Sequence, residues 1–362
     1  CAGGPVAPAF LVEEVSPIKA VSNALVAGAG RLWIVESGEN TVSTFAPDER
    51  VLFDEFVDVG DNQNPYDVFV DEQRRRVYVT NYLGNSLSVA DMDTGLVQEV
   101  VEDSSFDLPA GVAASGRWIY VTNTAFRRTG LFAPGSVLAL DRDTLEVVST
   151  LPTQAVNPQF ATVVEGADGL EWVAIVSSGT IAPNDAGTFV PTTPGALELW
   201  RPGEEEPVAE RLVFELGLPS AGEDPRTGFP GRVTQTPDRS KLYIPSGTGP
   251  VLFVFDMNAR EWVHDVASPL VFNASIEGSA LHHASMGDDG LLYITSFNDE
   301  RLYLWDTRCD ALLGPSILLD REMDLNAGPH GVVPWGAGAE RAAYFIMTLG
   351  NRIGRVRLDF SR

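Results

Sequence analysis

Histidine is rare in this sequence of 362 residues, and three of its four copies fall in two short segments near the C-terminus. His282 and His283 are adjacent, and His330 stands within a Pro-His-Gly sequence. An imidazole titrates near neutral pH, so it can accept or donate a proton during catalysis, and its neutral form binds zinc or copper. The three histidines are therefore the first candidates for a functional site.

Three interpretations of these histidines stay open. A metal site formed by His282, His283 and His330 lacks support from a further Cys or Glu at a matching position. His282 and His330 could instead act as acid and base on a ligand held by Arg232. In the third interpretation the histidines only hydrogen-bond within the lining of a channel, and the sequence favours this one. No metal ion and no other cofactor is expected.

The usual catalytic signatures are missing from the sequence. It contains no Gly-x-Ser-x-Gly elbow, no Cys-x-x-Cys-His haem motif and no His-Glu-x-x-His zinc motif. This pattern favours a protein that binds a partner over an enzyme.

An internal repeat supplies the elements that would position the histidines. The segment 77–81 (VYVTN) recurs at 119–123 as IYVTN, and weaker copies follow. The first aromatic residue of each copy, or its equivalent, stands at positions 33, 78, 120, 174, 243, 293 and 344. Short segments of alternating hydrophobicity flank each copy, so each unit predicts four strands. A repeat of this length is typical of the blades of a β-propeller.

Seven copies predict an all-β, seven-bladed β-propeller. The last unit holds only three strands, and the segment 10–15 near the N-terminus is left over. We therefore expect the N-terminal strand to pair with the last blade and close the ring, which removes exposed strand edges. Residues 1–8 are predicted to be a tether and residues 9–362 a single propeller domain.

The strand YVTN, followed by GNSLSV and DMDTG, resembles the YVTN-repeat β-propeller family. Two copies, 77–95 and 119–145, are close to the family pattern, whereas the other five have diverged. The resemblance implies the propeller fold. It does not imply one function, because relatives include surface-layer and periplasmic propellers, with lactonases and quinoprotein-like enzymes on related scaffolds.

Aligning the repeat brings the start of each innermost strand to the mouth of the central channel. The residues at this position are Asn23, Tyr66, Asp67, Ala110, Gly111, Gln159, Phe160, Gly231, Arg232, His282, His283 and His330. From this ring we predict that a ligand would contact Asp67, Gln159, Arg232, His282, His283 and His330. Insertions at 125–135, 180–195 and 219–229 are expected on the same face. Five apolar residues there are candidates for a protein-binding patch: Phe126, Leu131, Phe132, Phe189 and Val190.

The chain carries a formal net charge of −25, from 25 Lys and Arg against 50 Asp and Glu. So acidic a surface repels phosphate backbones, which argues against binding of nucleic acid. No apolar run reaches the 18 or so residues that span a bilayer as a helix.

The sequence begins with Cys1, followed by small residues. This start resembles a mature bacterial lipoprotein, whose terminal cysteine carries acyl chains that anchor it to a membrane. Ala2 rather than Asp at the second position points by the same analogy to the outer membrane, on its periplasmic or cell-surface side. Cys309 would then be a lone buried thiol, whereas the alternative is a disulfide between the two cysteines.

These observations together favour a lipid-anchored cell-envelope propeller that binds or scaffolds a protein partner. The alternative is a propeller hydrolase or lyase, similar to a lactonase, that uses His282, His330 and Arg232 at the channel mouth.

Overall fold

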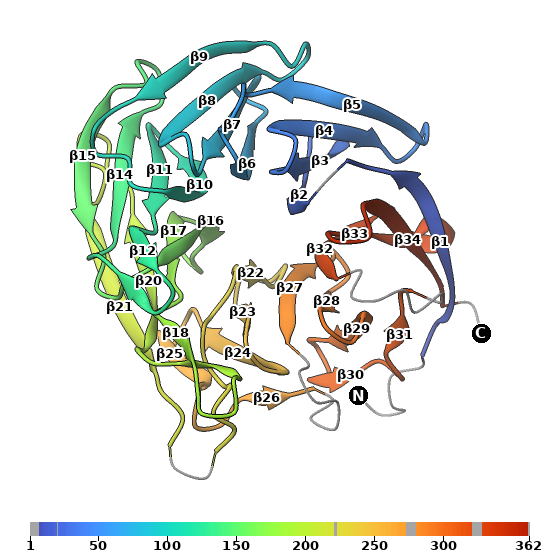
Figure 1. The fold of residues 1–362 in the computed structure, drawn as a ribbon. Helices are drawn as coiled ribbons and strands as arrows, with labels where there is room; N and C mark the ends of the chain where they lie inside the picture. The colour runs from blue at the N-terminus through green and yellow to red at the C-terminus, as the bar shows by residue number, and fades with distance from the viewer. Residues whose placement is uncertain (1–6, 20, 221–222, 273–279, 321–327, 361–362) are drawn as a thin grey trace.

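The computed structural model describes residues 7–19, 21–220, 223–272, 280–320 and 328–360. Seven small antiparallel sheets surround a central channel, with the innermost strand of each sheet facing the channel (Figure 1). The all-β, seven-bladed propeller predicted from the repeat is confirmed. No helix in the described part of the chain is long and apolar enough to cross a membrane.

The first four blades each contain four strands, in the order inner to outer. They are β2 (Ser22–Gly28), β3 (Arg31–Glu36), β4 (Thr41–Ala46) and β5 (Val51–Asp58); β6 (Pro65–Asp71), β7 (Arg76–Asn81), β8 (Ser86–Asp91) and β9 (Val97–Glu102); β10 (Pro109–Ser115), β11 (Trp118–Asn123), β14 (Ser136–Asp141) and β15 (Val147–Pro152); and β16 (Pro158–Glu165), β17 (Glu171–Ser177), β20 (Gly195–Arg201) and β21 (Glu210–Gly217).

The fifth and sixth blades each carry an additional short strand that pairs with the third strand. They are β22 (Thr234–Gln235), β23 (Lys241–Pro245), β24 (Val251–Asp256), β25 (Glu261–His264) and β26 (Leu270–Val271); and β27 (Leu281–Met286), β28 (Leu291–Ser296), β29 (Arg301–Asp306), β30 (Ala311–Leu312) and β31 (Ile317–Leu318). The seventh blade holds β32 (Pro329–Trp335), the short 3-10 helix η1 (Gly338–Glu340), β33 (Ala342–Met347) and β34 (Arg352–Asp359).

The N-terminal strand β1 (Ala9–Pro17) completes the seventh blade as its outermost strand. It runs antiparallel to β34, from the pair Ala9–Asp359 to the pair Pro17–Arg352. In Figure 1 the blue first strand accordingly lies beside the red last strand. The ring closure predicted from the leftover N-terminal segment is therefore confirmed.

The hydrophobic core lies between adjacent blades. Every residue of β11 is buried, and in β7 only Arg76 is not, because neighbouring blades cover both faces of these strands. One core cluster joins Tyr78 and Leu87 of the second blade to Val112 and Ile119 of the third. A strand covered on both faces favours β-branched and aromatic residues, which accounts for the repeated Tyr-Val pattern.

In two blades the threonine of the repeated motif, Thr80 or Thr295, hydrogen-bonds to the next blade. The Thr80 hydroxyl donates a hydrogen bond of 2.5 Å to the Ala110 carbonyl at the start of the next inner strand. The Asn81 amide donates to Ser86 Oγ and Ser88 Oγ within its own blade, both at 2.9 Å. The Thr80 hydroxyl and the Asn81 side-chain NH2 group therefore have partners, and the Thr80 bond fixes the start of the inner strand β10 against the second blade.

The two cysteines differ in what the structure shows of them. Cys309 is disulfide-bonded, so the expectation of a lone thiol was wrong. The predicted lipidation site, Cys1, lies outside the described residues, and the tether 1–8 is described only at its last two residues.

Candidate functional site

The inner strands begin with a shared irregularity that directs side chains toward the channel. In six of the seven inner strands the pairing register shifts within the first residues, as between Pro65 and Val68 in β6 or between Pro329 and Val332 in β32. A bulge of this kind re-aims the side chain that it carries. The residues at the shift include Tyr66, Gln159, His282 and His330. The same irregularity, repeated in successive blades, therefore positions the residues of the site.

In five blades the residue just before the innermost strand has a left-handed backbone, and in the fifth blade so does the residue just before the bridge between Pro230 and Ser246. These residues are Val21, Asn64, Leu108, Asn157, Phe229 and Gly328, with φ between 46° and 60°. Gly328 has a further constraint, because a Cβ there would lie 2.4 Å from the Phe297 ring. Bulky residues in this region of backbone space are strained, and strain of this kind tends to gather where function requires a fixed geometry.

A cavity of about 230 Å³ lies at the channel mouth and gathers most of the predicted residues. Its lining comprises Asn23, Ala24, Leu25, Val26, Tyr66, Gln159, Phe160, Phe229, Arg232, His282, His283 and His330. Gln159, Arg232 and all three histidines of the predicted ligand-binding set therefore face one space. Asp67 does not line the cavity, because its side chain is buried behind Arg232.

His282 and His330 lie against each other in this cavity. Their ring centroids are 4.1 Å apart at an interplanar angle of 49°, and the Phe297 ring lies 5.2 Å from that of His282. The Nδ1 atoms of both histidines are buried and have no hydrogen-bond partner in the described structure. A buried polar atom without a partner is costly, which makes both atoms natural contacts for a ligand.

The third histidine is held in one tautomer by the backbone. His283 Nδ1 accepts a hydrogen bond of 3.3 Å from the Val332 amide, so the proton of the neutral ring is on Nε2. The hydroxyl of Thr295, at the place of Thr80 in its own blade, lies 3.3 Å from the carbonyl oxygens of both His283 and His330. The blade-connecting threonine thus positions two of the three histidines.

Burial keeps all three imidazoles neutral at physiological pH. Loss of solvent lowers the pKa of His282 to about 4. It lowers the pKa of His283 to about 3, with smaller contributions from the charges of Arg232 and His282. The pKa of His330 is lowered well below its ordinary value, again mainly by burial. A neutral imidazole has one unprotonated nitrogen, which can accept a proton or bind a metal ion, but in His283 this nitrogen already accepts the hydrogen bond of Val332.

Arg232 reaches across the channel from the fifth blade to the second. Its guanidinium forms an ion pair of 2.5 Å with Asp67 Oδ1 and lies 5.6 Å from the centroid of the Phe160 ring. Asp67 Oδ2 accepts a hydrogen bond of 3.1 Å from the Val112 amide of the third blade. Four blades therefore fix the orientation of one arginine.

The other polar lining residues are held less directly. The Tyr66 ring stacks on Tyr82 at 5.4 Å, and burial raises the pKa of the Tyr66 hydroxyl above its usual range. Gln159 Oε1 accepts a hydrogen bond of 3.4 Å from Ser178. Phe229 was not predicted as a lining residue, although its position before Pro230 matches that of Asn64 before Pro65 and so carried a usable signal.

The arrangement does not form a multidentate metal centre in the described structure. Across residues 7–360, excluding the stretches that the structure leaves undescribed, no group of three or more His, Cys, Asp or Glu side chains is placed to hold a metal ion. The alternative metal set His282, His283 and His330 therefore gains no support from their geometry.

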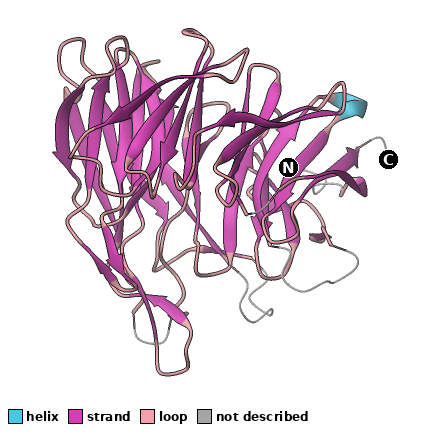
Figure 2. Ribbon diagram, turned by 45° about the horizontal axis from the view of Figure 1, so that its top comes forward, coloured by secondary structure: helices cyan, strands magenta, loops and turns pink. Residues whose placement is uncertain are grey.

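The three insertions meet on one face beside the cavity. Two of them form the hairpins β12 (Phe126–Arg128) with β13 (Leu131–Phe132) and β18 (Ile181–Pro183) with β19 (Phe189–Pro191). A Cβ on Gly130 would lie 3.6 Å from the Ile181 carbonyl, and one on Gly228 would lie 2.5 Å from Pro191. Figure 2 shows loops and hairpin strands extending beyond the body of the ring on one side. Leu131 and Phe189 are exposed, and the other three predicted patch residues are half-buried.

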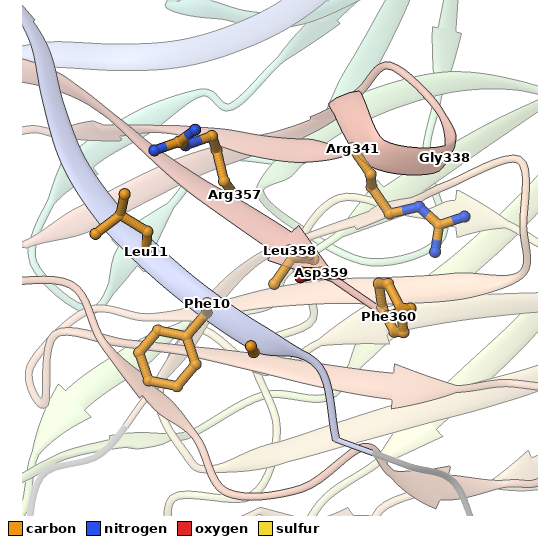
Figure 3. Close-up of a pocket in the computed structure, with 9 residues that line it drawn as sticks. Phe10, Leu11, Gly338, Arg341, Arg357, Leu358, Asp359 and Phe360 are labelled. Atoms are coloured by element: carbon orange, nitrogen blue, oxygen red, sulfur yellow. The ribbon is translucent and has the colours of Figure 1, made fainter. Parts of the chain in front are cut away.

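A second cavity, of about 650 Å³, lies on the outer rim between β1, β34 and the end of η1 (Figure 3). Phe10 and Leu11 lie on one side of it, and the Arg341 guanidinium lies 4.7 Å from the centroid of the Phe360 ring. Arg341 is ion-paired with Asp289 and Arg357 with Glu13. Both arginines that line this cavity are ion-paired and its described lining holds no histidine, so the channel mouth is the stronger site.

Comparison with known proteins identifies the fold only. No family model and no curated protein matches the chain. Among solved structures, a streptogramin B lyase matches with a TM-score of 0.66 and 14% identity over 97% of this chain and 98% of that one. Virginiamycin B lyase from Staphylococcus aureus matches with a TM-score of 0.68 and 12% identity over 97% and 100%. Hydrazine synthase from Kuenenia stuttgartiensis matches with a TM-score of 0.67 and 14% identity over 94% and 96%.

Proposed function

We propose that the channel mouth is the active site of a lyase or hydrolase that cleaves an ester-type bond by acid–base chemistry. The observation that carries the proposal is the pair His282 and His330, which line one cavity with Arg232 and whose buried Nδ1 atoms have no hydrogen-bond partner in the described structure. Two neutral imidazoles next to a fixed guanidinium combine a proton acceptor with a group that stabilises developing negative charge.

In the lyase version the chemistry needs no co-reactant. A free imidazole nitrogen takes the proton from the carbon next to a carbonyl group, and the electron pair forms a double bond to the neighbouring carbon. The bond from that carbon to the ester oxygen breaks, and the imidazolium returns its proton to the departing oxygen. Arg232 donates hydrogen bonds to the carbonyl oxygen while it carries negative charge. In the hydrolase version the imidazole activates a water molecule instead.

The fold adds support of a weaker kind. Three of the similar solved structures are lyases, and one of these is a catalytically inactive virginiamycin B lyase with quinupristin. At 14% identity this likeness does not transfer an activity, but it shows that the propeller architecture accommodates a lyase site.

The test is turnover of uncharged lactones and cyclic depsipeptides, with quinupristin among them, followed by mass spectrometry. His282→Ala and His330→Ala should each lower the rate by about 100-fold or more, the usual contribution of a general base. His264→Ala is the matched control, because this fourth histidine lies on the outer strand β25 and bonds to the Ser268 carbonyl. A product heavier by one water indicates the hydrolase, and an unchanged mass indicates the lyase. Equal rates in all variants would refute the proposal.

A second candidate is a scaffold that binds a protein partner in the cell envelope, anchored in the outer membrane through Cys1. The exposed side chains of Leu131 and Phe189 on two touching hairpins favour it, since apolar side chains gathered on one face mark interaction sites. We expect Leu131→Ser with Phe189→Ser to abolish in-cell crosslinking to one defined envelope protein. Phe10→Ser is the control, because Phe10 is equally exposed, at 44%, but lies on the outer rim. Equal loss in the control would rule out a specific patch.

A further inference from the structure

The charge of the channel-mouth cavity determines which substrates it can accept. Arg232 is the only permanently charged side chain among the described residues that line the cavity. The remaining polar groups are the Tyr66 hydroxyl, the amides of Asn23 and Gln159, and three imidazoles. Burial holds those imidazoles in the neutral form.

The carboxylate of Asp67 neutralises the positive charge of Arg232. Asp67 is almost fully buried, with 1% of its side chain exposed, and contacts Arg232 on the side away from the cavity. The Val112 amide fixes the second carboxylate oxygen of Asp67, so the carboxylate cannot turn away when a ligand arrives. The buried pair and the neutral imidazoles give the site no net charge, although it retains strong hydrogen-bond donors.

We infer that the cavity selects an uncharged carbonyl compound over a carboxylate or phosphate, and that Asp67 sets this selectivity by neutralising Arg232. The inference rests on the proposed function, since it names the substrate class of the same site. An anion would lose its hydration on entering a space with no net positive charge, and burying an uncompensated charge is costly. A neutral carbonyl oxygen needs only a hydrogen bond from Arg232.

The size and walls of the cavity agree with a small cyclic group. A volume of about 230 Å³ equals about seven or eight water molecules at about 30 Å³ each. The rings of Phe160 and Phe229 supply apolar walls, and Gln159 and Asn23 supply further hydrogen bonds. One lactone or ester-bearing ring fits such a space, and a larger substrate would place the rest of its body over the hairpins.

The test measures binding rather than turnover, by saturation-transfer NMR with acetamide, δ-valerolactone, acetate and inorganic phosphate as probes. Wild-type protein should bind the uncharged probes and neither anion. Asp67→Asn leaves the guanidinium uncompensated and should tighten acetate binding at least tenfold. The double variant Asp67→Asn with Arg232→Gln restores a cavity without net charge, and it should again reject acetate.

Two results would overturn the inference: acetate or phosphate binding to the wild-type site that Arg232→Gln abolishes, or failure of both uncharged probes to bind. If Asp67→Asn does not fold, probe binding to the wild-type protein and to the double variant still tests the inference. The outcome is separate from that of the proposed function, because histidine variants that keep full turnover would refute acid–base catalysis while leaving the charge selectivity in place.

Discussion

Replacing Arg142 by Met should lower the free energy of unfolding by about 3–5 kcal/mol, because it leaves the Asp71 carboxylate buried without its partner. Arg142 follows β14 in the third blade, and Asp71 ends β6 in the second. Two hydrogen bonds of 2.7 Å join the guanidinium to both carboxylate oxygens, and their side chains are 8% and 0% exposed. The Tyr78 hydroxyl donates to the same carboxylate at 3.1 Å.

The state of Asp71 explains the size of this effect. Burial by itself would raise the pKa of Asp71, but the hydrogen bonds and charge of Arg142 hold it below the usual value. Without Arg142 the folded protein must either keep a buried charge or take up a proton, and both cost stability at neutral pH.

Urea denaturation followed by tryptophan fluorescence measures the effect. Arg74→Met is the matched control, because its ion pair with Asp143 joins the same two blades at an exposed position, with Asp143 69% exposed. Such a pair contributes about 0–1 kcal/mol. Adding Asp71→Asn to Arg142→Met should recover part of the loss. Equal effects of the two arginine substitutions would show that burial of the pair has no consequence.

Acidification from about pH 7 to about pH 4 should destabilise the protein through its channel-mouth histidines. Burial lowers the pKa of His282 to about 4 in the folded protein, from about 6.5 for a solvent-exposed imidazole. Between about pH 6.5 and about pH 4 the unfolded chain therefore binds a proton at His282 while the folded chain does not, so unfolding becomes easier as pH falls. The shift corresponds to about 3 kcal/mol for His282 alone.

Carboxylates also lower the unfolding free energy as pH falls. The contribution of the histidines is therefore obtained by measuring unfolding free energies across this range for wild type and for histidine variants. His282→Gln should flatten the curve relative to wild type, whereas His264→Gln on the outer strand should leave it unchanged. Parallel curves for wild type and His282→Gln would mean that His282 is protonated in the folded state at about pH 6.

The repeat made the fold and much of the site predictable. Once the YVTN segments are aligned, blade number, ring closure and the ring of channel-mouth residues follow, because each copy has the same strand order. His282 and His330 were predicted to be neighbours, and their rings lie 4.1 Å apart.

Features that join different blades could not be predicted. The ion pair between Asp67 and Arg232 links positions 165 residues apart that belong to non-adjacent blades, and no local pattern encodes it. The tautomer of His283 depends on the Val332 amide of another blade. The disulfide at Cys309 was predicted only as the alternative to a lone thiol, because two cysteines alone do not distinguish a disulfide bond from a lipid-modified cysteine.

The pairing of β1 with β34 has a consequence for how the protein is made. The ribosome makes β1 before the other strands of the described propeller and its partner β34 after them, so β1 stays unpaired while those strands are made. Blades made from consecutive strands can form as they emerge, but the seventh sheet is complete only after β34 has emerged. A nascent chain stalled before residue 352 would present the open edge of β33 and an unpaired β1, and would therefore be a target for chaperones and proteases that the finished ring escapes.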